Sequence, residues 1–163
     1  MSLQSIVKPL LALLFAFGTT GAVAQMPNHY GAPINLENAK KAAAAAAAEA
    51  RKNNWNMSIA VTDINGELVY LEKMDATQTG SVKVSLAKAR SAALYKRPTK
   101  VFQDAVAAGG AGLRILGLEG AVPVDGGFPI VMDGKIVGAI GVSGAAGDQD
   151  AQCAKAGVDA LAK

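Results

Sequence analysis

The 163-residue chain has very few of the residues that build metal, redox or disulfide sites: one cysteine, one histidine and one tryptophan. A single cysteine excludes an intramolecular disulfide and any Cys-x-x-Cys site, and a single histidine excludes zinc motifs that need paired histidines. Aromatic residues make up 5% of the chain and charged residues 18%, whereas hydrophobic residues make up 51%. The chain is therefore too apolar for a disordered protein, and its length suits one folded domain.

The charge balance and the glycine pattern argue against nucleic acid and nucleotide ligands. The formal net charge is only +3, and the sequence has no cluster of lysine and arginine residues like those that bind the phosphate backbone of nucleic acids. Glycines recur every three residues near the C-terminus, at Gly138, Gly141, Gly144 and Gly147. No Gly-x-Gly-x-x-Gly opens a helix there and no Walker lysine follows, so we expect these glycines to allow close packing of a helix on a sheet.

Residues 1–24 have the pattern of a secretory signal peptide. Lys8 precedes an apolar run at 9–17, and small residues then lead to Ala-Val-Ala at 22–24, which suits signal peptidase. The run is shorter than the roughly 20 residues that a membrane-spanning helix needs. The sequence predicts a periplasmic or secreted protein that begins at Gln25 after cleavage, with an uncleaved membrane anchor as the alternative.

Residues 25–34 are predicted to form a flexible arm, because they contain two prolines and a glycine, and 35–163 to form one domain. Asn35 is the expected N-cap of the first helix. Asn-Gly at 65–66 and Asp-Gly at 133–134 predict two tight hairpins with type I′ turns. The predicted helices are 36–54, 80–97, 99–108 and 148–162, and the predicted strands are 57–64, 67–74, 113–116, 121–124, 128–132 and 135–142.

This order of elements indicates an α+β fold, because both hairpins join antiparallel strands and the alternation of a doubly wound fold is missing. We expect a two-layer sandwich with about five antiparallel strands and helices packed on one face. An apolar stripe predicts the buried side of the second helix: Val82, Leu86, Ala89 and Ala93. Lys88 would lie among the cations on the other side. The uncovered sheet face would favour association of identical chains.

Few residues indicate chemistry by themselves. His29 lies in the predicted arm, where it is either a haem or metal ligand or simply solvated. Cys153 is expected to be a small buried residue within a helix, with a reactive thiol as the alternative. A set of cations either meets an anionic ligand or forms a solvated helix face: Lys88, Arg90, Lys96 and Arg97, with Lys73 earlier in the chain. No pair of carboxylates is placed by the sequence, so a hydrolase has no specific support.

Several stretches resemble those of one known family. They are Ile-Ala-Val-Thr-Asp-Ile-Asn-Gly at 59–66, Lys-Met-Asp at 73–75, Ala-Lys-Ala-Arg-Ser-Ala-Ala at 87–93, Arg-Pro-Thr at 97–99, Gly-Gly-Phe-Pro-Ile at 126–130, Val-Gly-Ala-Ile-Gly-Val-Ser-Gly at 137–144 and Asp-Gln-Asp at 148–150. Over 35–163 the chain is similar to the GlcG/HbpS family, a haem-degrading and haem-binding domain family that includes the C-terminal domain of PduO-type proteins. Lys73 stands where that family has arginine, and the chain has no Glu-x-x-Glu for iron.

The resemblance implies a profilin- or PAS-like sandwich and a homo-oligomer such as a dimer, tetramer or octamer. It also implies an exported protein that binds haem or another tetrapyrrole, in haem sensing, storage or degradation. Thr99, Tyr95 or His29 would approach the iron, and Arg90 or Lys88 would meet the propionates.

An alternative function within the family is that of an accessory protein or enzyme acting on small hydroxy or keto acids in glycolate-type metabolism. Lys73, Asp75 and Arg90 would then form the anion site. A purely structural oligomer without a ligand is the third alternative. The sequence leaves open whether any reaction is catalysed.

Overall fold

The computed structural model describes residues 29–162, so the predicted signal peptide lies outside the described residues. No helix among these residues is long and apolar enough to cross a membrane. The elements in chain order are α1 (Leu36–Lys52), β1 (Ser58–Asp63), β2 (Leu68–Lys73), α2 (Ser81–Tyr95), α3 (Lys100–Ala107), the 3₁₀ helix η1 (Gly110–Gly117), β3 (Gly127–Met132), β4 (Lys135–Ser143) and α4 (Gly147–Asp159).

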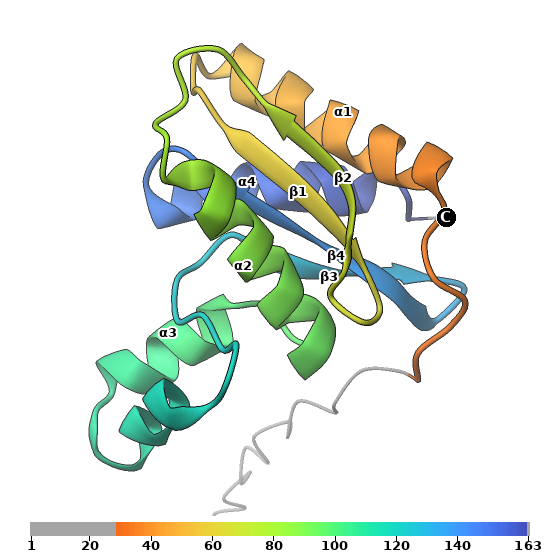
Figure 1. Cartoon of the computed structure of the whole chain (residues 1–163). Helices are drawn as coiled ribbons and strands as arrows, with labels where there is room; N and C mark the ends of the chain where they lie inside the picture. The colour runs from red at the N-terminus through yellow and green to blue at the C-terminus, as the bar shows by residue number, and fades with distance from the viewer. Residues whose placement is uncertain (1–28, 163) are drawn as a thin grey trace, which may run out of the picture.

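The sheet has four antiparallel strands in the order β2-β1-β4-β3, which confirms the α+β fold (Figure 1). The expectation of about five strands is wrong, because 110–117 form a 3₁₀ helix and 121–124 form no strand. Gly109, Gly110 and Gly120 adopt positive φ angles in this region, and such angles break the extended backbone that a strand needs. The profilin- or PAS-like type stays a prediction.

Helices cover both faces of the sheet, so the expected packing on one face is wrong. α2 lies on one face, and α1 and α4 lie on the other (Figure 1). Successive residues of β4 point to opposite faces. Ile140 joins the core with α1, whereas a Cβ at Gly141 would overlap the backbone carbonyl of Ser85 in α2. Because the central strands are buried on both faces, an uncovered sheet face no longer supports self-association.

The alanine-rich sequence of α1 forms the largest part of the core on its side of the sheet. Asn35 caps this helix as predicted, since its side chain accepts a hydrogen bond of 2.8 Å from the Asn38 N–H. Small side chains allow close approach: a Cβ at Gly157 of α4 would lie 2.8 Å from the Ala42 carbonyl oxygen. The fully buried alanines are Ala39, Ala42, Ala43, Ala46, Ala47 and Ala50.

The two hairpins differ in their turns. Asp133 and Gly134 have φ angles of 48° and 72°, as the predicted type I′ turn requires. In the β1–β2 turn only Gly66 has a positive φ, of 79°, so type I′ is wrong there. The Asp63 carboxylate instead accepts hydrogen bonds from the Asn65 and Glu67 N–H groups, at 2.8 and 2.9 Å. This side chain stabilises a longer loop whose glycine occupies the left-handed region.

The described part of the segment expected to be a flexible arm runs along β4. Tyr30 forms an isolated bridge with Ile136, and the Gly31 N–H donates to the Ile136 carbonyl at 2.8 Å. The Ile34 N–H donates to the Val137 carbonyl at 2.7 Å, and the Ile34 side chain is buried. Residues 29–34 are therefore packed on the domain.

Cys153 of α4 is completely buried in the core, as the first of its two alternatives predicted. Burial raises the pKa of its thiol to about 12. Because the thiolate is the reactive form, the native protein should react with a thiol-specific disulfide reagent at least roughly 100-fold more slowly than the protein unfolded in guanidinium chloride. Absorbance of the released thiol measures both rates, and equal rates would contradict this burial.

Candidate functional site

α2 carries most of the predicted site residues, and its buried side is more polar than expected. Ala89 and Ala93 are buried as predicted, whereas Val82 and Leu86 are only partly buried. The helix ends at Tyr95, where Lys96 adopts the left-handed conformation with φ 55°, two residues before Pro98. The remaining buried side chains of α2 are Ser81, Ser85, Lys88, Ser91 and Ala92.

Lys88 is a clear correction, because it lies between α2 and the sheet and not on a solvated helix face. Its side chain is 1% exposed, and its Nζ donates to Asp150 Oδ2 at 2.7 Å and to the Val142 carbonyl at 2.9 Å. A Cβ at Gly126 would come within 2.9 Å of this Nζ, so the absent side chain of Gly126 leaves room for the ammonium. Lys88 therefore has no access to a haem propionate in this conformation.

Asp150, the partner of Lys88, lies in the first turn of α4 as expected, but it is buried there. Its other oxygen accepts the Ala145 N–H at 3.1 Å. Burial raises the pKa of this carboxyl, and the hydrogen bond from Lys88 opposes that effect. Sequence reasoning missed this pair, although both residues lie in stretches that carry the family resemblance.

Thr99 and Tyr95 both hold the backbone in place. Thr99 is fully buried, and its Oγ1 accepts the Gly127 N–H at 3.0 Å. The Tyr95 hydroxyl donates to the Glu119 carbonyl at 2.6 Å, and its ring meets Phe102 edge-on at 5.3 Å. In this conformation Thr99 does not face the surface, and Tyr95 ties the segment after η1 to the end of α2.

The outer face of α2 forms one wall of a shallow groove of about 300 Å³, which we call the α2 groove. Gly120 and Val122 form its second wall, and two hydrogen bonds to α2 hold this segment in place. The Tyr95 hydroxyl donates to the Glu119 carbonyl, and the Ser91 Oγ accepts the Val122 N–H at 3.0 Å. Arg90 is 44% exposed and lies beside the β1–β2 turn, with its Nε donating to the Gly66 carbonyl at 3.1 Å. The residues lining the groove are Lys83, Leu86, Ala87, Arg90, Gly120 and Val122.

The three residues of the alternative anion site are not brought together. Lys73 and Asp75 line a polar cavity of about 340 Å³ at the end of β2, with Arg51, Asn56, Glu72 and Met74. Arg90 lies at the opposite end of β2, where its Nη2 is 3.4 Å from Glu67. An anion site that includes Arg90 is therefore wrong, because β2 separates it from the other two residues. The cavity itself remains, with Arg51 paired to Glu72 at 3.1 Å.

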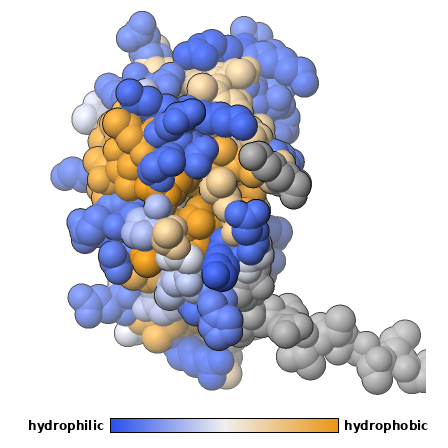
Figure 2. Space-filling view, turned by 90° about the vertical axis from the view of Figure 1, so that its right-hand side faces the viewer, coloured by the Kyte–Doolittle hydropathy of each residue, from blue (hydrophilic) through white to orange (hydrophobic). Residues whose placement is uncertain are grey.

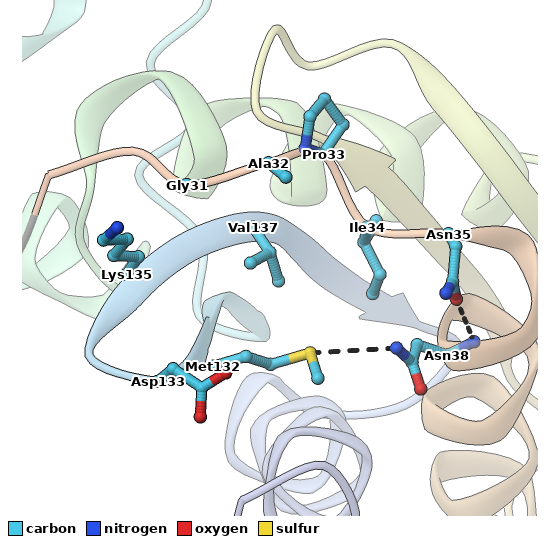
Figure 3. Close-up of a pocket in the computed structure, with 10 residues that line it drawn as sticks. All are labelled: Gly31, Ala32, Pro33, Ile34, Asn35, Asn38, Met132, Asp133, Lys135 and Val137. Atoms are coloured by element: carbon cyan, nitrogen blue, oxygen red, sulfur yellow. Dashed lines mark hydrogen bonds between the residues drawn. The ribbon is translucent and has the colours of Figure 1, made fainter.

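A third cavity, of about 300 Å³, lies between residues 31–35 and the β3–β4 hairpin (Figure 3). Asn38 Nδ2 donates to Met132 Sδ at 3.9 Å on one side of it, and Lys135 lies on the other. None of the predicted site residues lines this cavity.

His29 is exposed at the start of the described chain. Its carbonyl accepts the Ile136 N–H at 3.1 Å, and the next residue, Tyr30, donates its hydroxyl to the Ala93 carbonyl at 2.8 Å. The Lys96 ammonium lies 4.2 Å from the centre of the Tyr30 ring. The chain at His29 is thereby anchored near the C-terminal end of α2.

No group of three or more histidine, cysteine, aspartate or glutamate side chains within 29–162 could hold a metal ion. Among the predicted residues, only Arg90 lines a groove with an apolar floor, and Lys83 supplies a second cation there.

Comparison with known proteins places these features in a family. The family model described as haem-degrading protein HbpS-like matches residues 34–159. Protein GlcG of Escherichia coli (strain K12) is 43% identical over 100 residues, which cover 61% of this chain and 73% of GlcG.

Solved structures agree with the sequence comparison. The crystal structure of a double mutant of Streptomyces reticuli HbpS has a TM-score of 0.74 and 30% sequence identity, and the match covers 94% of this chain and 99% of that one. A crystal structure of a PduOC:heme complex has a TM-score of 0.71 at 22% identity, over 79% of this chain and 95% of that one, which shows likeness of fold alone. The chain belongs to the GlcG/HbpS family.

Proposed function

We propose that this chain is an exported protein that binds haem or a related tetrapyrrole, and that the α2 groove receives part of the ring. The observation that carries the proposal is the combination of an apolar floor, formed by Leu86, Ala87 and Val122, with the cations of Arg90 and Lys83. Haem needs this combination because its ring is flat and apolar and its two propionates are anionic. An arginine offers paired N–H donors that suit a carboxylate.

The groove residues fit the ring and its propionates but not the iron. No histidine, methionine, cysteine or tyrosine lines the groove, and these residues are the usual axial ligands. Of the three residues predicted to approach the iron, only His29 is exposed; Tyr95 is partly buried and hydrogen-bonded, and Thr99 is fully buried. We therefore favour His29 as the axial residue.

The family and the chain's N-terminal sequence add support. The matching family model is described as haem-degrading, and a relative of the same fold has been crystallised as a heme complex. Residues 1–24 favour export. Haem sensing, storage and degradation all begin with binding. A groove of about 300 Å³ lies at the small end of ligand sites, so a homo-oligomer would cover more of the ring.

Haemin titration of the purified mature chain tests this proposal. We expect a shifted Soret band at micromolar haemin, and weakening of binding by about 10-fold in Arg90→Ala and in Lys83→Ala, because each removes about 1.4 kcal/mol of attraction for a propionate. His29→Ala should change the position of the Soret band. Lys155→Ala, which removes an exposed cation from α4, is the matched control and should bind haemin normally. The absence of any Soret shift at micromolar haemin would end this proposal.

A second candidate is an accessory protein or enzyme that acts on small hydroxy or keto acids. The observation that favours it is the polar cavity that Lys73 and Asp75 line with Arg51 and Glu72. Arg51 is paired with Glu72 there, so Lys73 is the cation that a ligand carboxylate would meet. Glycolate or glyoxylate should then raise the melting temperature of the protein, and Lys73→Ala should abolish this rise. The absence of stabilisation by any small acid would reject this candidate.

A further inference from the structure

Two groups of the β1–β2 turn hold the Arg90 side chain where it lines the α2 groove. Its Nε donates to the Gly66 carbonyl at 3.1 Å, and its Nη2 lies 3.4 Å from Glu67 Oε1. Among the described residues, none accepts a hydrogen bond from its Nη1. The guanidinium is therefore fixed through one nitrogen and already pairs with a carboxylate, while one of its donor groups stays open.

The backbone of the turn fixes the position of Glu67. The Glu67 N–H donates to the Asp63 carboxylate at 2.9 Å, and the Glu67 carbonyl accepts the Asp63 N–H at 2.9 Å. The preceding residue, Gly66, has a φ of 79°, and a Cβ there would lie 2.9 Å from Arg90 Cγ. Glycine at this position lets the arginine side chain lie against the turn, so the base of the Glu67 side chain is held beside the guanidinium.

The contact between Arg90 and Glu67 is weak enough for a ligand to displace it. The two side chains are 44% and 71% exposed, and their separation of 3.4 Å is longer than that of a good charge-assisted hydrogen bond. Exposed ion pairs of this kind contribute little to stability. A ligand carboxylate that accepts from two guanidinium nitrogens in parallel makes a stronger contact than the single one of Glu67. The Glu67 carboxylate thus occupies the position that a ligand carboxylate would take.

Lys83, the second cation of the α2 groove, differs from Arg90 in this respect. It is exposed, and within the described residues its ammonium has no ion pair. The two cations are seven residues apart on α2, which is about two helical turns or 10 Å. A ligand with two carboxylates would therefore find one cation free at Lys83, whereas the other becomes available only when Glu67 leaves Arg90.

Hydrophobic side chains adjoin this turn. Leu68 is 47% exposed and Leu94 is 44% exposed, and a Cβ at Gly66 would lie 3.5 Å from Leu94 Cγ. Figure 2, which looks at the molecule from the right-hand side of Figure 1, shows hydrophobic side chains gathered on the surface and bordered by hydrophilic ones. This side of the molecule includes the β1–β2 hairpin. An apolar ligand whose carboxylate reaches Arg90 would have apolar side chains to contact beside the turn.

We propose that Glu67 is a built-in competitor for the ligand carboxylate, which occupies Arg90 in the free protein and is displaced on binding. This inference rests on the proposed function, because the α2 groove is its site. It narrows the ligand to tetrapyrroles with ionised carboxylates, since an uncharged ester cannot take the place of Glu67 on the guanidinium. Glu67 acts through Arg90, so it is a positioning residue that lowers the affinity of the groove.

Titration of Glu67→Gln with haemin is the first test. We expect its dissociation constant for haemin to be about 2- to 5-fold lower than that of the wild-type chain, because an uncharged amide competes less for the guanidinium. Haemin dimethyl ester should bind the wild-type chain and Glu67→Gln equally. Asp159→Asn is the matched control, because it removes the same charge from an exposed ion pair on α4, which Lys155 forms at 2.9 Å. This control should bind haemin as the wild-type chain does.

Propionate ion tests the same exchange without haem. The Nε–H signal of Arg90 in NMR spectra of the haem-free chain can be assigned by its loss in Arg90→Lys. This signal should move as propionate is added at constant ionic strength, because the carboxylate displaces Glu67 from the same guanidinium. The midpoint should come at an about 2- to 5-fold lower propionate concentration in Glu67→Gln, and should not change in Asp159→Asn.

The two ligands separate failure of this inference from failure of the proposed function. If propionate shows the competition but haemin gives no Soret shift, haem binding is rejected and the competition by Glu67 stands. Equal haemin affinities and equal propionate midpoints in the wild-type chain and Glu67→Gln would overturn the inference while haem binding remains. An equal gain in affinity for the dimethyl ester would also overturn it, because Glu67 would then act on the shape of the groove and not on the carboxylate. Thermal unfolding should show that every variant folds.

Discussion

Lys88→Met should lower the free energy of unfolding by about 3–5 kcal/mol, because it leaves the Asp150 carboxylate buried without its cation. The two side chains are only 1% and 4% exposed, and their charged atoms are 2.7 Å apart. Methionine has a similar length to lysine and keeps most of the packing, so the loss reports the charge and not a cavity. Urea unfolding followed by circular dichroism measures it.

A double replacement separates the cost of the orphaned charge from the value of the pair. Lys88→Met with Asp150→Leu should be more stable than Lys88→Met alone, since no buried charge is left unpaired. The exposed pair of Lys155 and Asp159, 2.9 Å apart, is the matched control: Lys155→Met should cost less than about 0.5 kcal/mol. Additive losses in the double replacement would contradict this interpretation.

The defect of Lys88→Met should also depend on pH. Burial already raises the pKa of Asp150 in the wild-type protein, and removal of Lys88 removes the contact that lowers it most, so this pKa rises further. The folded variant then binds a proton more readily than the unfolded chain. Its deficit should therefore be full at pH values above the raised pKa of Asp150 and shrink as the pH falls through that value. A deficit that grows in acid would show that the carboxyl is not the cause.

Gly141→Ala should be the most destabilising single methyl addition in the sheet, with a loss of at least about 3 kcal/mol. A Cβ at this position of β4 would overlap the Ser85 carbonyl and lie 2.4 Å from the Ala89 nitrogen. Both atoms belong to the backbone of α2, so no side chain can rotate away. The helix would have to move off the sheet and thereby disturb Lys88, which lies on the same helix.

Gly147→Ala is the control for this substitution, because Gly147 belongs to the same series of glycines at intervals of three residues as Gly141. At Gly147 the nearest atoms to an added Cβ are 3.6 and 3.9 Å away, which are ordinary contacts. Alanine also favours the helix that begins there, so this variant should be as stable as the wild-type protein or slightly more stable. Thermal unfolding compares the two variants, and equal losses would contradict a close approach that is specific to Gly141.

The glycine pattern shows which packing features the sequence could predict. The interval of three residues predicted close packing, which is confirmed at Gly141 against α2. At Gly138 and Gly144 the close neighbours are instead the backbones of Thr62 and Asn56, in β1 and the segment before it. Periodicity thus indicated that little space was available, but not which element occupied it.

For the candidate site, too, the sequence predicted some residues correctly and misplaced others. The sequence singled out Arg90 as a ligand-facing cation, and it does line the α2 groove. It assigned the same role to Lys88, two residues earlier, which the structure buries against Asp150. Each turn of α2 has one side that faces solvent and one that faces the sheet. The expected apolar stripe did not include the polar residues that lie on the side facing the sheet, such as Ser85, Lys88 and Ser91. The role of Lys83 in the α2 groove was missed, because the second wall of this groove comes from residues 120–122, which lie far from Lys83 in the sequence.

From its sequence alone, this protein could be assigned to its family, to an antiparallel α+β fold and to most of its helix and hairpin positions, because caps, turns and periodicity act within a few residues. The tertiary structure decided what depends on distant segments: the covering of both sheet faces, the pairing of Lys88 with a residue 62 positions away, and the separation of Arg90 from Lys73. The physical reason is that burial and ion pairing are set by which helix packs on which strand. Local sequence patterns cannot encode that choice, because the same apolar helix face could pack on either side of a sheet.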